Sequence, residues 1–201
     1  MEILIFPDAS SLARKSADLL ESQIKTYPDS VIGLATGSSP LGLYEELIHR
    51  HKEYDLSFAG VKTFNLDEYV GIPAKHPQSY RTFMDENLFN KIDIDASNTQ
   101  VPDGMADNPL EVGPAYEKMI EEAGGIDLQV LGIGTDGHIG FNAPTSSLGS
   151  ITRVKTLTRQ TIEDNSRFFK SDEFQPKLAI TMGIKTIMDA RRILLLACGE
   201  N

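Results

Sequence analysis

Short apolar runs alternate with longer amphipathic segments along most of this chain. The runs end at glycine, proline or polar residues, as buried strands do, and they fall at residues 31–35, 61–65, 128–132, 177–182 and 193–197. Between them, apolar residues recur at helical spacing with charged residues on the opposite side of each segment. This alternation predicts an α/β fold with a mainly parallel sheet flanked by helices.

The helical patterns have recognisable ends. Asp8 or Ser10 can cap the first helix, which must stop before Pro28, and Pro40 is expected at the first position of the second. Further helices are expected at residues 80–88, 114–123 and 184–190.

Weaker patterns lie between and before these elements. Residues 3–6 are a short apolar run, which predicts an opening strand. They are not expected to be a signal peptide, because they lack its basic flank and its apolar length. Residues 99–101 predict a short strand within a long connection, and the alternation at 153–158 predicts an exposed strand. A helical piece is expected to open at Thr161 or Asp164.

Length and composition set the broad class. A chain of 201 residues fits a single domain, residues 1–201, more readily than two small ones. The formal net charge of -10 argues against binding a nucleic-acid backbone or an anionic membrane, and no segment has the length of a membrane span. Cys198, the single cysteine, is expected in the core, and its isolation fits a reducing, cytoplasmic setting. A monomer and a homo-oligomer both agree with this composition.

The richest chemistry follows the apolar run at 128–132. Asp136 and His138 are separated only by Gly137, so a chain leaving a strand tip can aim a carboxylate and an imidazole into one crevice. This pair suits proton transfer, because histidine titrates near neutrality and a carboxylate can fix its tautomer. The alternative is a glycine-rich connecting loop whose polar side chains bond only to the backbone.

Two other strand ends carry polar residues. The loop of Thr36, Gly37, Ser38 and Ser39 opens a helix, where backbone donors and hydroxyls suit a phosphate, although it lacks the lysine and glycines of nucleotide-binding loops. Plain capping of the helix by Ser38 or Ser39 is the alternative.

Asp67, with Glu68 beside it, stands just past the run at 61–65. Taken alone, these acids could be solvated loop charges. Because the carboxyl ends of parallel strands share one edge, the Thr36 loop, Asp67 and the Asp136–His138 pair are expected to converge there.

With these residues in view, the chain resembles the glucosamine-6-phosphate deaminase (isomerase) family. The matching blocks span nearly the whole sequence: 34–42 (LATGSSPLG), 64–71 (FNLDEYVG), 76–80 (HPQSY), 131–142 (LGIGTDGHIGFN) and 165–169 (NSRFF). The resemblance implies a Rossmann-like three-layer fold. It also implies conversion of glucosamine 6-phosphate, an amino-sugar phosphate, to fructose 6-phosphate and ammonia, with neither a metal nor an organic cofactor.

The resemblance assigns roles to individual residues. Asp67 matches the base that moves a proton between C2 and C1 of the sugar. His138 matches the group that opens the sugar ring, and Asp136 is its neighbouring carboxylate. The amides of Ser38 and Ser39, together with Arg167, match the phosphate site. Residues 147–170 match a mobile lid, and in allosteric relatives the positions of Ser146, Arg153 and Lys155 help to bind an activator, N-acetylglucosamine 6-phosphate.

Two features depart from the family pattern. The family has Phe-Asn-Glu-Pro where this chain has Phe-Asn-Ala-Pro, so Ala143 replaces a glutamate that partners the imidazole. Alanine cannot accept a hydrogen bond from a ring N–H, which predicts weaker orientation of His138. Family members also continue past the last strand with a phosphate-binding lysine, a helix and a strand, so this part of the fold is expected to be missing after Asn201.

These departures keep other functions open. A deaminase for galactosamine 6-phosphate or another amino-sugar phosphate would account for the altered Ala143 site. The sister 6-phosphogluconolactonases share a glycine-rich Asp-Gly-His segment, although the block around Asp67 favours isomerase chemistry. A catalytically impaired sugar-phosphate binder is the alternative from a different class.

Overall fold

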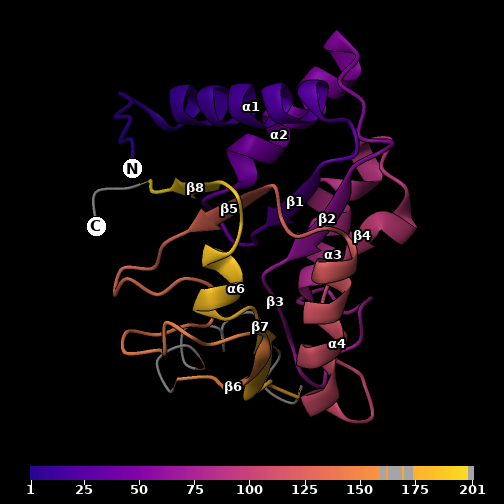
Figure 1. Ribbon diagram of the computed structural model, residues 1–201, viewed down its shortest axis with the longest axis vertical. Coiled ribbons are helices and arrows are strands. Elements are labelled where there is room, and N and C mark those ends of the chain that lie inside the picture. Colours follow the sequence, from indigo (N-terminus) through magenta and orange to yellow (C-terminus); the bar gives the residue numbers. More distant parts are fainter. Residues whose placement is uncertain (159–161, 163–168, 170–173, 199–201) are drawn as a thin grey trace.

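A five-stranded parallel sheet forms the centre of the fold (Figure 1). The computed structural model describes residues 1–158, 162, 169 and 174–198. The strand order is β4-β2-β1-β5-β8, and every pairing in this sheet is parallel. Its strands are β1 (Val31–Leu34), β2 (Lys62–Asn65), β4 (Thr99–Gln100), β5 (Leu128–Gly132) and β8 (Ile193–Leu196).

Helices cover both faces of this sheet, which confirms the predicted α/β fold. Helices α1, α2 and α3 pack over one face, in a core that includes Leu20, Tyr44 and Met84. Helices α4 and α6 pack over the other, around Tyr116 and Ile187. The bounds are α1 (Ala9–Thr26), α2 (Leu41–Tyr54), α3 (Tyr80–Asn87), α4 (Pro109–Glu122) and α6 (Ile184–Met188), with short 3-10 turns η1 (Phe89–Lys91) and η2 (Ala96–Asn98).

A second, antiparallel sheet of three strands lies at the opposite end of the molecule from α1 (Figure 1). Its order is β3-β7-β6, with β3 (Asp67–Tyr69), β7 (Leu178–Thr181) and β6 (Arg153–Thr156). Strand β3 follows β2 after a single residue, Leu66, whose carbonyl accepts from Met182 N at 2.7 Å. The predicted strands at 153–158 and 177–182 therefore exist, but both belong to this small sheet.

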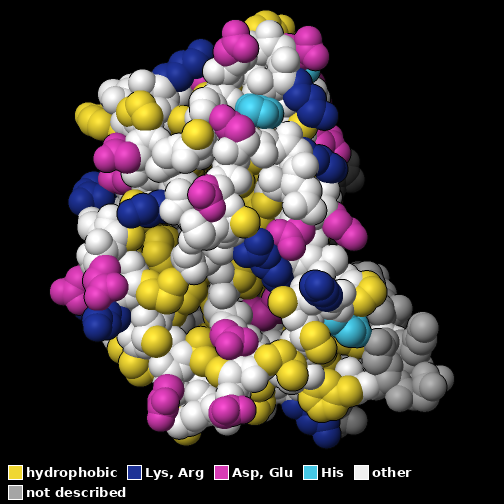
Figure 2. Space-filling model, turned by 90° about the vertical axis from the view of Figure 1, so that its right-hand side faces the viewer, with side chains coloured by type: hydrophobic (Ala, Val, Ile, Leu, Met, Phe, Trp, Pro, Cys, Tyr) yellow, Lys and Arg dark blue, Asp and Glu magenta, His cyan; other side chains and the backbone are white. Residues whose placement is uncertain are grey.

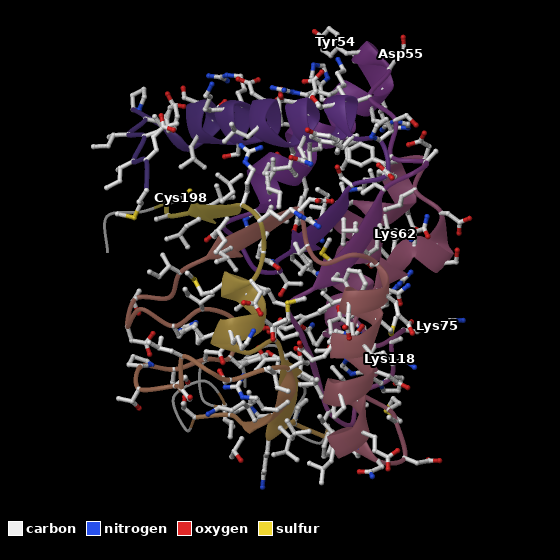
Figure 3. All side chains as sticks on the ribbon, in the orientation of Figure 1. Tyr54, Asp55, Lys62, Lys75, Lys118 and Cys198 are labelled. Carbon is white, nitrogen blue, oxygen red and sulfur yellow. The ribbon has the colours of Figure 1, made fainter. Side chains whose placement is uncertain are left out.

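Two expectations about the chain ends were wrong. Residues 3–6 form no strand; Ile3 is 72% exposed and Ile5 is 91% exposed. An apolar run becomes a strand only where a neighbouring strand offers hydrogen bonds, and none of the described strands pairs with this segment. Cys198 is exposed and not in the core, because it lies past the end of β8, an edge strand of the sheet (Figure 3).

Helix α4 begins earlier than the predicted residue 114. Asn108 caps it by accepting from Leu110 N, and Pro109 occupies the first turn, where a missing N–H has no cost. Pro114 lies inside the helix. Beside it, a Cβ on Gly113 would come within 2.4 Å of the Thr152 carbonyl, so only glycine lets α4 lie this close to β6.

The surface is mixed in charge. On the face that Figure 2 shows, acidic and basic side chains are interspersed with apolar ones. Among the described helices, none has the combination of length and hydropathy needed to cross a bilayer.

Candidate active site

Three strand ends of the parallel sheet open into one cavity of about 530 Å³. A volume of this order is typical of small-molecule sites. The loop after β1 lines it, together with the loop after β5, which carries His138, and with β3 and the start of α3. The structure therefore brings six predicted site residues to a shared space: Thr36, Gly37, Ser38, Ser39, Asp67 and His138.

The loop at residues 36–39 presents the amino end of α2 to this cavity. Gly37 has a φ of +94°, a left-handed conformation that favours glycine. Helix α2 starts at Leu41, one residue later than predicted, and no side chain caps its amino end. Capping by Ser38 or Ser39, the alternative explanation for these residues, is therefore wrong. Uncapped amides at the amino end of a helix offer donors and a positive dipole to an anion such as phosphate.

Asp67 is the most strongly perturbed acid of the cavity. It starts β3 and is only 5% exposed. Burial and the neighbouring charge of Glu68 raise the pKa of Asp67 to about 8, while a hydrogen bond from Thr181 works in the opposite direction. A carboxyl group whose pKa lies near neutrality can exchange protons with a bound substrate.

Glu68 points away from Asp67 and anchors α3. Its Oε1 accepts from Tyr69 N at 2.8 Å and Tyr80 N at 3.0 Å, and its Oε2 accepts from Arg81 N at 3.0 Å. Burial raises the pKa of Glu68, and these three amides oppose that effect. Neither acid of this pair is a solvated loop charge, because both are buried.

Asp136 and His138 form a close pair at the cavity rim. His138 Nδ1 lies 2.6 Å from Asp136 Oδ1, which also accepts from His138 N at 3.0 Å. The backbone and ring N–H groups of His138 lower the pKa of Asp136. Asp136 does not line the cavity itself. A Cβ on Gly134 would lie 2.1 Å from the imidazole, so glycine is needed there to admit the ring.

Aromatic side chains form the opposite wall of the cavity, and the sequence analysis missed them. Tyr80 stacks on Phe141 with ring centroids 6.1 Å apart, and its hydroxyl lies 3.1 Å from that of Tyr69. Phe169 packs edge-on against Tyr69, at 6.4 Å. Tyr69 and Phe141 each lie within three residues of a predicted site residue, and that closeness was the available signal.

The structure describes only some of the remaining predicted features. Arg167 and most of the predicted helical piece lie outside the described residues. Ala143 is half-buried in the loop after His138, and its carbonyl accepts from Ser146 N at 3.1 Å. In the part of the chain that is described, no three His, Cys, Asp or Glu side chains are grouped as a metal site requires.

Comparison with known proteins agrees with this geometry. A family profile described as glucosamine-6-phosphate isomerases/6-phosphogluconolactonase matches residues 7–201. Glucosamine-6-phosphate deaminases of Shewanella woodyi and Cellvibrio japonicus are 57% and 58% identical over 201 residues, covering 100% of this chain and 76% of theirs.

Solved structures show the same relationship. One described as a monomeric glucosamine-6-phosphate deaminase has a TM-score of 0.93 and 42% identity, over 97% of this chain and 81% of that one. The 6-phosphogluconolactonase of Trypanosoma cruzi has a TM-score of 0.75 at 22% identity, over 98% of this chain and 80% of that one, so it shares the fold. The chain therefore belongs to the glucosamine-6-phosphate isomerase/6-phosphogluconolactonase family.

Proposed function

We propose that this protein converts glucosamine 6-phosphate and water to fructose 6-phosphate and ammonia. The observation that carries the proposal is the shared cavity of the buried Asp67 carboxylate and the His138 imidazole, beside the uncapped amino end of α2. It is supported by relatives of 50% identity or more that are named glucosamine-6-phosphate deaminase.

The reaction needs two kinds of proton transfer. His138, held by Asp136, moves the protons that open the pyranose ring to the free aldehyde. Asp67 then removes the proton from C2 while the aldehyde oxygen at C1 takes up a proton, which gives an enolamine, and the Asp67 carboxyl group returns its proton to C1. The resulting C2 imine adds water and loses ammonia, which leaves the ketone of fructose 6-phosphate. The carboxylate regains its initial state, so no oxidant or reductant is consumed.

The phosphate is held at the amino end of α2. The amides of residues 37–39 donate to its oxygens, as do the hydroxyls of Ser38 and Ser39. The resemblance adds the guanidinium of Arg167, which lies outside the described residues. These local donors offset the net charge of -10 that would otherwise repel an anionic substrate.

The proposal extends to the organisation and the setting of the enzyme. In this proposal the chain acts as one domain, residues 1–201. The resemblance also implies a lid at residues 147–170, a range that includes β6 and of which residues 159–161, 163–168 and 170 lie outside the described part of the chain. The enzyme is a hydrolase of cytoplasmic amino-sugar metabolism, in which N-acetylglucosamine is catabolised.

A second candidate function is supported by Ala143. Without a carboxylate at this position, His138 loses one hydrogen-bond acceptor that family members supply, so the cavity could bind a sugar phosphate and turn it over poorly. Alternatively, Ala143 could change the substrate preference of the site from glucosamine 6-phosphate to galactosamine 6-phosphate. The lactonases are too distant in sequence, at 19–22% identity, to support their activity here.

One assay separates these functions. The full 201-residue chain is incubated at high concentration with glucosamine 6-phosphate or galactosamine 6-phosphate, and ammonia and ketose phosphate are measured. The deaminase is supported if glucosamine 6-phosphate yields ammonia and ketose phosphate in equal amounts and if the Asp67→Asn variant forms neither product. Ligand-induced thermal stabilisation without products supports the binder, and faster turnover of the galactosamine epimer assigns the other substrate.

A further inference from the structure

Thr181 lies directly opposite Asp67 in the antiparallel pairing of β3 and β7. Side chains at opposing positions of an antiparallel pair share one face of the sheet. Thr181 is completely buried, and its hydroxyl lies close enough to the Asp67 carboxyl group to help lower the pKa of that group. The hydroxyl donates to the Met182 carbonyl at 3.4 Å, a long hydrogen bond to an oxygen that already accepts from Asn142 Nδ2 at 2.8 Å, so its proton can turn to the Asp67 carboxylate instead.

The same hydroxyl accepts a hydrogen bond from the loop that carries His138. Phe141 N donates to Thr181 Oγ1 at 3.2 Å. One hydroxyl has a single proton to donate and lone pairs to accept, so it can serve Asp67 and Phe141 at the same time. Thr181 thus contacts both sides of the site, although it does not line the cavity.

Gly140 shows how closely these groups are packed. A Cβ on Gly140 would lie 3.0 Å from Thr181 Oγ1 and 3.1 Å from Asp67 Oδ2. The loop is held against this position by Asn142, whose amide donates to the Ile139 carbonyl at 2.9 Å as well as to Met182. The carboxylate, the hydroxyl and the loop backbone therefore form one compact unit.

We propose that Thr181 is a positioning residue of the site: its hydroxyl joins the base Asp67 on β3 to the loop that carries His138. The proposal rests on the function proposed above, in which Asp67 is the base. Removing the hydroxyl while keeping the side-chain volume frees the carboxylate to rotate and detaches Phe141 from β7. It also removes a donor that favours the ionised carboxylate.

Several charged or titratable groups surround Asp67, and each must stay unchanged if a substitution is to test Thr181 alone. Glu68 is its neighbour on β3, Tyr80 approaches from α3 and Tyr116 from α4. Arg153 of β6 pairs with Thr181 from the other side, and His138 shares the cavity. None of these groups is altered by a substitution at Thr181.

The test is Thr181→Val, followed by the carbon-13 carboxyl resonance of Asp67 in the ligand-free full chain and by the pH profile of kcat/KM. The midpoint of the Asp67 titration is expected to move to higher pH by about one pH unit, the usual size of one hydrogen bond to a charged group. The acid limb of the kcat/KM profile should move by the same amount. In Thr181→Ser, which keeps the hydroxyl, the Asp67 midpoint and the acid limb should both return to their values in the unmodified protein. If Thr181→Val does not fold, Thr181→Ala is measured in its place with the same expectation.

Thr63→Val is the matched control. Thr63 is also a buried strand threonine, 3% exposed, and within the described chain its hydroxyl has no hydrogen-bond partner. This change should leave the Asp67 titration where it is. Identical titrations in Thr181→Val and the unmodified protein would overturn the proposal. Failure of the proposed function is a separate result, since it would be the absence of products from the unmodified protein at every pH.

Discussion

The ring nitrogen Nδ1 of His138 lies 2.6 Å from Oδ1 of Asp136, and this pair sits at the rim of the cavity with both side chains about half exposed. The same oxygen accepts from the backbone N–H of His138. Asp136 thereby fixes the ring orientation and directs the other ring nitrogen, Nε2, away from the carboxylate. A solvent-exposed pair of this kind acts through geometry more than through Coulombic attraction, which water screens.

Asp136→Asn should therefore impair catalysis more than stability. The amide can donate to Nδ1 and favour the wrong tautomer, so kcat is expected to fall by about 10- to 100-fold, the usual effect of losing a carboxylate that supports a histidine. Steady-state assays with glucosamine 6-phosphate measure the change. The matched control is Asp107→Asn, which alters an exposed loop aspartate outside the cavity, and kcat should be unchanged there. Equal losses in both variants would contradict the assigned role.

Ala143→Glu should raise turnover. The resemblance described in the sequence analysis implies a glutamate at this position, and a carboxylate there would give the His138 ring a second acceptor that alanine cannot provide. We expect kcat to increase by about tenfold or more, with little change in KM if the phosphate contacts stay as they are. Ala143→Gln is the control for size, because it adds bulk without charge. A kcat that stays the same or falls would mean that the histidine is oriented by other groups.

The pH dependence of catalysis tests Asp67. Only the ionised carboxylate can accept the C2 proton, so kcat/KM should rise with pH through a midpoint near 8, the raised pKa of Asp67. Asp67→Asn should lower kcat by about 10²- to 10⁴-fold, the usual contribution of a general base. Titration of the substrate phosphate and amine, measured separately, is subtracted from the profile. A kcat/KM that does not change between pH 6.5 and pH 9, after that subtraction, would exclude Asp67 as the base.

Stability should depend on the same group in a defined direction. The pKa of Asp67 is 3.8 when the group is unperturbed and about 8 in the folded protein, so the folded state retains a proton that the unfolded chain loses. Between these values the free energy of unfolding falls as pH rises, by about 1.4 kcal/mol per pH unit at most. Asp67→Asn removes this dependence and should be more stable than the parent at pH 8. Chemical denaturation at pH 5 and pH 8 measures both effects, and a parent protein equally stable at the two pH values would disagree.

The strand-end residues could be predicted because parallel topology places them at one edge. Thr36, Asp67 and His138 each follow a buried apolar run, and the rule that carboxyl ends converge needs only the order of the strands. The aromatic wall could not be predicted in this way, because Tyr80 and Phe141 have the same pattern as ordinary core residues. Their functional position depends on the direction of α3 and of the loop after His138.

The small antiparallel sheet was harder to foresee. Strand β3 has only three residues and begins with two acids, a composition that predicts a loop. It forms because the backbone of β7 pairs with it and because Met182 N donates to the carbonyl of Leu66 just before it, contacts that are more than a hundred residues away in sequence. Residues 3–6 show the opposite case. Their composition suits a strand, but they form none because no described strand pairs with them.

Glu68→Gln should shift the Asp67 titration to lower pH, opposite to the shift expected for Thr181→Val. Glu68 contributes a negative charge beside Asp67, and its removal makes ionisation of Asp67 easier. The same change weakens the anchor of α3, because a glutamine offers one acceptor oxygen where the carboxylate serves three amides. A loss of about 1–3 kcal/mol in the free energy of unfolding is expected for such buried amides. Glu86→Gln, an exposed change on α3, is the control and should alter neither quantity. If Glu68→Gln moved the Asp67 midpoint upward, its charge could not be what raises that pKa.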